Sequence, residues 1–119
     1  MNTATYLGQS SWRLPLTIDS GPLGCDFAYT GTDCGYNVSL SSGEMAHLFY
    51  ITLGNIGRHD TSGLLTGCSS PYIPSPSCLA NRGPFSNLEP VDYHSGTTYL
   101  PDPNFAWRFY FNVGYQDYG

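Results

Sequence analysis

The sequence predicts a small α+β domain with small antiparallel sheets, one helix and long loops stapled by disulfides. Three observations lead to this fold class. Residues 93–113 contain alternating apolar and polar side chains, residues 42–53 have the spacing of an amphipathic helix, and four cysteines bracket two loops rich in Gly, Pro, Ser and Thr. A length of 119 residues suits a single domain over residues 1–119 that buries a core of its own.

Residues 93–113 are predicted to form two β-strands joined by a turn. In the second arm, every other residue from Phe105 to Val113 is apolar, and the positions between them include Arg108 and Tyr110. This period of two is typical of a half-buried strand. The intervening LPDPN segment combines prolines, which cannot donate to a sheet, with Asp and Asn, which suit turns. We therefore assign the aromatic face of the second arm to the core and leave the polar face for contact with a ligand.

A helix is predicted over residues 42–53. Ser41 suits the N-cap, Glu44 three residues later would complete a capping box, and Gly54 suits the residue after the last turn. His47 lies off the apolar stripe without a suitable metal-binding partner, so we interpret it as a structural histidine. The stripe at helical spacing consists of Met45, Leu48, Phe49, Thr52 and Leu53.

The four cysteines indicate the compartment. Cys25 and Cys34 are nine residues apart, and Cys68 and Cys78 are ten apart. Three connectivities are possible, and local pairing is the simplest because each bridge would then staple one irregular loop. A zinc site would favour C-x₂₋₄-C spacings, which the sequence lacks. Disulfides are therefore preferred over metal, and they predict an oxidising, exported location.

Export requires a targeting signal, and the first 20 residues lack a basic region followed by an apolar one. We therefore expect this chain to be a piece of a longer protein with its signal peptide upstream. No run approaches the roughly 20 apolar residues of a membrane helix, so membrane insertion is not expected.

The charge balance excludes several classes of partner. The chain has no lysine, four arginines and nine carboxylates, with a net charge of −5. Nucleic acid, polyanions and anionic membranes all need clustered cations. Asp26 and Asp33 lie in the first cysteine loop without a D-x-D-x-D-G calcium pattern, and we interpret them as turn residues. His59-Asp60 is interpreted as a solvated turn, and no metal or cofactor is predicted.

Five segments carry a family resemblance. In order they are SSWRLP, a cysteine pair ending in CGYN, SGEMAHLFYITLGN, NRGPFSNLE and YHSGTTYLPDPNFAWRFYF. Together they span nearly the whole chain, and none of them is a catalytic motif. In order and spacing the set resembles a bacterial exported domain of unknown function, typified by the C-terminal domain of the Legionella collagen-like adhesin and common in proteins with PEP-CTERM sorting signals.

The resemblance implies a C-type-lectin-like fold, with two helices flanking small antiparallel sheets. It also implies that the chain lacks the N-terminal strand and the last strand of the family, so that residues 3–7 would be the remnant of the first helix. The hairpin at 93–113 would then lack a neighbouring strand and leave an unpaired edge. The chain departs from the family pattern at His94 and Thr98, where members have Trp and Glu.

The expected function is a non-catalytic, lectin-like binding module outside a bacterial cell, for a glycan or a surface polymer. The chain is rich in Tyr, Asn and Asp, and such side chains stack on sugar rings and bond their hydroxyls. Calcium-dependent sugar binding is not favoured, because Val91 stands where an E-P-N loop needs Asn.

Two alternatives stay open. One is a structural or assembly domain of an extracellular matrix or appendage. The other is an enzyme related to the formylglycine-generating oxidases, which need reactive cysteines. The oxidase is less favoured because the cysteines lie in Gly/Ser/Pro loops without adjacent cations.

The predicted ligand surface combines the loop before the hairpin with the polar face of the hairpin. For Arg108 and Tyr110 the alternative is structural, with Arg108 pairing a nearby carboxylate and Tyr110 covering an edge of the sheet. The predicted contact residues are Asn87, Glu89, Asp92, His94, Thr98, Asp102, Asn104, Arg108 and Tyr110.

Overall fold

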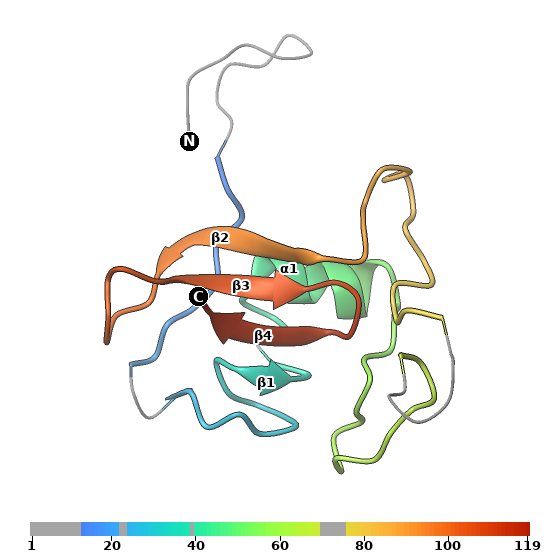
Figure 1. Ribbon diagram of the computed structural model, residues 1–119, viewed down its shortest axis with the longest axis horizontal. Coiled ribbons are helices and arrows are strands. Elements are labelled where there is room, and N and C mark those ends of the chain that lie inside the picture. Colours follow the sequence, from blue (N-terminus) through green and yellow to red (C-terminus); the bar gives the residue numbers. More distant parts are fainter. Residues whose placement is uncertain (1–12, 22–23, 39, 70–75) are drawn as a thin grey trace, which may run out of the picture.

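The computed structural model describes residues 13–21, 24–38, 40–69 and 76–119. In these ranges a four-stranded antiparallel sheet packs with one face against a short helical segment, which confirms the α+β class (Figure 1). Residues 10–12 of the SSWRLP segment and the helix remnant expected at residues 3–7 lie outside the described residues.

The sheet has the strand order β1-β4-β3-β2, with β1 (Gly35–Tyr36), β2 (Asp92–Thr98), β3 (Ala106–Tyr110) and β4 (Tyr115–Tyr118). The hairpin prediction is confirmed, because β2 and β3 pair antiparallel. The prediction that the hairpin lacks a neighbouring strand is wrong. Gly114, at a φ of +75°, ends a turn after β3 and returns the chain as β4, which pairs with β3 on its other side.

The outer edge of β2 is partly covered by the segment that precedes the first cysteine loop. Gly96 N donates to Pro15 O at 2.7 Å, and Thr17 N donates to Thr97 Oγ1 at 3.0 Å. The contacts fall where the β2–β3 register shifts, between His94 and Thr98. A bulged, covered edge is less available for pairing with another chain.

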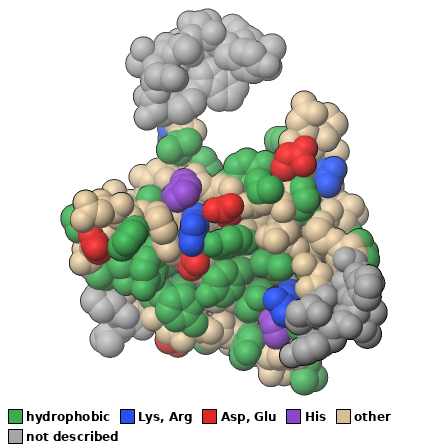
Figure 2. All heavy atoms as spheres, in the orientation of Figure 1, with side chains coloured by type: hydrophobic (Ala, Val, Ile, Leu, Met, Phe, Trp, Pro, Cys, Tyr) green, Lys and Arg blue, Asp and Glu red, His purple; other side chains and the backbone are tan. Residues whose placement is uncertain are grey.

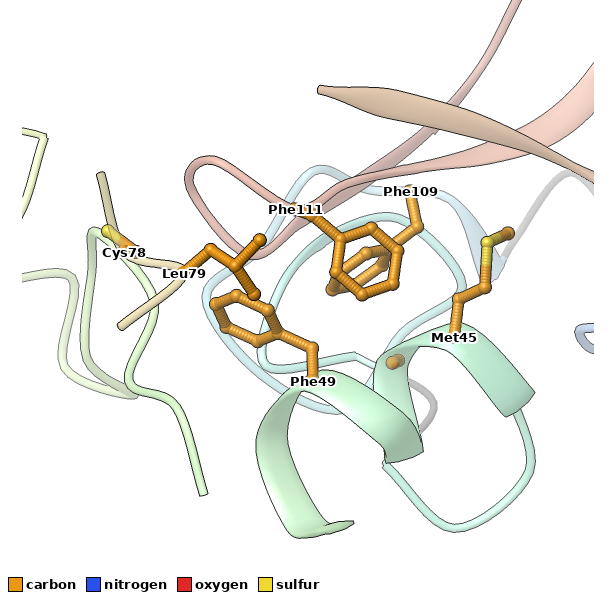
Figure 3. Close-up of a cluster of buried hydrophobic side chains, with 7 residues drawn as sticks. Met45, Phe49, Cys78, Leu79, Phe109 and Phe111 are labelled. Carbon is orange, nitrogen blue, oxygen red and sulfur yellow. The ribbon is translucent and has the colours of Figure 1, made fainter. Parts of the chain in front are cut away.

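The core lies between the helical segment and the inner face of β3. The ring of Phe49 lies 5.5 Å from that of Phe109 and 6.0 Å from that of Phe111, and Figure 3 shows these rings pointing toward one another. Trp107 on β3 is fully buried as well. The assignment of Phe105 to the core is wrong, because Phe105 lies before β3 begins and is 41% exposed.

The helix is shorter than predicted and changes type along its length. It begins at Glu44 as α1 (Glu44–His47) and continues as the π-helical turn η2 (Leu48–Thr52), so the bounds 42–53 are corrected. The capping box is wrong, because the N-cap is Gly43, which makes no side-chain cap. Glu44 instead forms an exposed ion pair with Arg13 at 2.8 Å. Gly54, at a φ of +68°, follows the last turn as predicted.

Two disulfides, Cys25–Cys34 and Cys68–Cys78, confirm local pairing. Cys34 is fully buried just before β1, and Cys78 belongs to the core cluster. Each bridge therefore ties an irregular loop to the buried part of the domain. The disulfides indicate an oxidising, non-cytoplasmic environment.

Asp19 holds the N-terminal segment to the hairpin. Its Oδ2 accepts hydrogen bonds from Trp107 Nε1 at 2.9 Å and Leu100 N at 2.7 Å, and its Oδ1 accepts one from Gly21 N at 2.8 Å. Burial by itself would raise the pKa of Asp19. The hydrogen bonds from Leu100, Gly21 and Trp107 outweigh that effect and lower the pKa below its ordinary 3.8.

We therefore expect stability to depend on this carboxylate in acid. The pKa of Asp19 is lower in the folded state than in the unfolded state, so ionised Asp19 stabilises the fold above about pH 4. This stabilisation is lost as the pH falls through the folded-state pKa. The substitution Asp19→Asn should remove this part of the acid dependence and cost about 1 kcal/mol at neutral pH, because one acceptor oxygen is lost. Urea unfolding from neutral pH down to about pH 2 measures both effects. An Asp19→Asn curve parallel to the wild-type curve would contradict the assignment.

Candidate ligand-binding surface

The face of the sheet that points away from the core gathers charged and tyrosine side chains. Residues directly opposite one another in neighbouring strands share a face. The register places His94 opposite Arg108, and Arg108 opposite Asp117. We call this surface the outer face. It consists of Asp92 and His94 on β2, Arg108 and Tyr110 on β3, Tyr115 and Asp117 on β4, and Tyr36 on β1.

Arg108 is the centre of the charges on the outer face. Its Nε donates to Asp117 Oδ1 at 2.7 Å, and its NH1 lies 3.6 Å from Asp92 Oδ2. The hydrogen bond with Asp117 is the largest cause of a raised Arg108 pKa. Figure 2 shows this face, with basic and acidic side chains side by side over the sheet. The structural interpretation of Arg108, as a partner of a nearby carboxylate, is confirmed.

A row of rings extends from Arg108 across the outer face. The Arg108 guanidinium carbon lies 5.1 Å from the centre of the Tyr110 ring, a cation–π distance. The ring of Tyr115 follows at 5.8 Å from that of Tyr110, and the ring of Tyr36 at 5.1 Å from that of Tyr115. Burial first, and then the charge of Asp117, raise the pKa of Tyr115 to about 12. The Tyr115 hydroxyl is therefore a neutral hydrogen-bonding group at physiological pH.

His59 extends this row and corrects the expected solvated turn. Its ring lies 4.7 Å from that of Tyr36, and its Nδ1 is 2.9 Å from the carbonyl oxygen of Gly63. Asp60 does behave as a turn residue, since its Oδ1 accepts hydrogen bonds from the backbone N–H groups of Ser62 and Leu64. The side chain of His59 is therefore half-buried against aromatic rings instead of solvated.

The structure brings together four of the nine predicted contact residues: Asp92, His94, Arg108 and Tyr110. The other five lie along the hairpin turn and the preceding loop. Thr98 pairs with Ala106 at the turn end of β2, and Asp102 accepts hydrogen bonds from Asn104 N and Nδ2 within the turn. Asn87 and Glu89 are exposed in the loop before β2.

Three outer-face residues were missed by sequence reasoning: Tyr36, Tyr115 and Asp117. If YQDY is read as a strand, alternation puts Tyr115 and Asp117 on one face and Gln116 on the other, and this could have revealed the two residues. Gln116 is in fact 1% exposed on the inner face. Tyr36 had no comparable signal, since β1 is only two residues long.

Among the residues that the structure describes, the remaining polar side chains form no cluster typical of a metal centre. Across the described ranges, no group of three or more His, Cys, Asp or Glu side chains is placed to hold a metal ion. Asp26 accepts a hydrogen bond from Ala28 N as a turn residue, as predicted, and the exposed ring of His47 lies beside Thr52 Oγ1.

In the part of the chain that the structure describes, no helix has the length and apolar character needed to cross a membrane.

Comparisons with protein-family models, curated proteins and solved structures found no match. The likeness to the exported lectin-like family therefore rests on the five sequence segments and stays a prediction.

Proposed function

We propose that this chain is a non-catalytic, extracellular carbohydrate-binding module and that the outer face is its contact surface. The observation that carries the proposal is the row of tyrosine rings beside the paired charges of Asp92, Arg108 and Asp117. Aromatic faces stack on the C–H faces of sugars, while carboxylate, guanidinium and phenol groups bond sugar hydroxyls. The predicted C-type-lectin-like fold and the oxidising compartment support the same proposal.

The charges of the outer face favour a neutral glycan. Arg108 is its one arginine, and the guanidinium is already engaged by Asp117 and Asp92. Two carboxylates against one guanidinium give the face a net negative formal charge, and the whole chain carries −5. A sulfated or uronic polymer would meet like charge without a free cation. A neutral polysaccharide meets no such penalty.

The oxidase alternative has less support. All four cysteines form disulfides, so a mechanism that needs reactive thiols would have to open one of these bridges. The assembly alternative makes a different prediction from the glycan proposal, namely association of the chain with itself in the absence of any polysaccharide.

The proposal predicts saturable binding to a neutral polysaccharide that is lost when the outer face is altered. Affinity electrophoresis in dextran, mannan and galactan, with dextran sulfate as the charged counterpart, provides the screen. Tyr110→Ala should weaken the binding about tenfold, the equivalent of about 1.4 kcal/mol of lost stacking.

Phe85→Ala is the matched control, because Phe85 is an aromatic residue of the preceding loop that is 47% exposed. It should leave the affinity unchanged, and thermal unfolding should show that both variants fold. Absence of retardation by every neutral polymer, or equal affinities for Tyr110→Ala and the wild type, would refute the proposal.

A further inference from the structure

A separate cavity of about 430 Å³ lies between the N-terminal segment, the first cysteine loop and the start of the helical region. Its volume is within the range of small-molecule sites, roughly 300–1,000 Å³. It contains none of the outer-face residues. Besides Asp33, the polar side chains that line it belong to Ser20, Thr30, Thr32, Asn37, Ser41 and Ser42.

Asp33 is the one acidic residue among the described residues that line this cavity. The residue is only 5% exposed, and among the described residues its side chain accepts hydrogen bonds from Ser20 alone, through N and Oγ. An ionised carboxylate has about four acceptor positions. The described ion pairs all belong to Glu44, Asp92 and Asp117, so none of them neutralises Asp33.

The backbone around this carboxylate is fixed from several sides. Asp33 O accepts a hydrogen bond from the buried Gln116 Nε2 at 2.6 Å, and Asp33 N donates to Gly24 O at 2.7 Å. The next residue, Cys34, is held by the disulfide to Cys25. A Cβ at position 24 would collide with the Asp33 carboxylate, so glycine leaves room for it. The carboxylate is therefore held in place before any ligand arrives.

We propose that this cavity binds a small hydroxylated ammonium compound of the amino-sugar class. A buried carboxylate is costly unless it is paired, and an ammonium group from a ligand supplies the missing charge. The Ser, Thr and Asn side chains around it can bond ligand hydroxyls, and the volume suits one sugar-sized unit. A metal ion is less suitable, because a single carboxylate lines the cavity and Ca²⁺ takes six to eight oxygen ligands.

Calorimetric titration with glucosamine at about pH 6, where its amine is protonated, tests the proposal. Glucosamine should bind at least tenfold more tightly than glucose, which lacks the ammonium group. Asp33→Asn keeps an oxygen acceptor for Ser20 but loses the charge, and should weaken glucosamine binding tenfold or more. Asp26→Asn makes the same charge change in the same loop on an exposed side chain, and should bind like the wild type.

Equal affinities for glucosamine and glucose, or an Asp33→Asn affinity equal to the wild-type one, would overturn the proposal. Thermal stabilisation by Ca²⁺ that depends on Asp33, without glucosamine binding, would also overturn it and would assign the cavity to a metal. If Asp33→Asn fails to fold, Thr30→Val and Ser42→Ala replace it. Both should weaken glucosamine binding, and unchanged affinities in both would reject the site. Tyr110→Ala should leave glucosamine binding intact, which separates this test from that of the outer face.

Discussion

Reduction of both disulfides should lower the free energy of unfolding by about 5–6 kcal/mol, because each closes a loop of about ten residues worth roughly 2.5–3 kcal/mol in the chain-entropy model. Domains of this size are stable by only about 5–15 kcal/mol. The reduced chain should therefore lose a large share of its stability and unfold at a much lower temperature than the oxidised one.

Thermal unfolding with and without a reductant measures this effect, and the single-bridge variants apportion it. Replacing Cys25 and Cys34 by Ser removes one bridge, and replacing Cys68 and Cys78 removes the other. Cys34 and Cys78 are buried, so each double variant also loses core packing and should unfold at a clearly lower temperature than the wild type. A reduced protein that melts with the oxidised one would show that the loops are held by other contacts.

Phe49→Ala should destabilise the domain by about 3–5 kcal/mol, the usual range for deleting a buried aromatic ring. Phe49 is fully buried and joins the helical segment to β3 through the rings of Phe109 and Phe111. Tyr50 also contacts the ring of Phe109, but among the described helical side chains only Phe49 makes ring contacts with both Phe109 and Phe111.

Ile51→Ala provides the control for this substitution. Ile51 lies in the same π-helical turn but is 55% exposed, so its truncation should change stability by no more than about 0.5 kcal/mol. Urea unfolding with the disulfides intact compares the two variants. A loss below about 1 kcal/mol for Phe49→Ala would mean that the helical segment does not rest on the sheet as described.

The hairpin and the helix could be predicted because their signals are local. Period-two alternation and a Pro/Asp/Asn turn define β2 and β3, and a stripe of Met45, Leu48 and Phe49 defines one face of the helix. The central position of β3 could not be predicted in this way. It depends on the turn through Gly114 and on β4, a strand of only four residues with no hydrophobic run to mark it in the sequence.

Other residues could not be placed from the sequence because their surroundings depend on the three-dimensional fold. Glu44 fits a capping box by spacing, yet Arg13 lies close enough in the fold to pair with it instead. Alternation in YQDY puts Asp117 on the same face as Tyr115, but its place opposite Arg108 depends on the pairing of β4 with β3. Asp33 was interpreted as a turn residue, and only the three-dimensional structure reveals that it is buried in the wall of a cavity.

Mapping of backbone and arginine side-chain NMR signals during titration tests the central claim most directly. The titrant is a neutral oligosaccharide cut from whichever polysaccharide retards the protein. The account predicts that the largest shifts fall on Tyr110, Tyr115 and the Nε–H of Arg108, with smaller shifts on His94. Shifts confined to other parts of the chain, with these four residues unchanged at saturation, would contradict it.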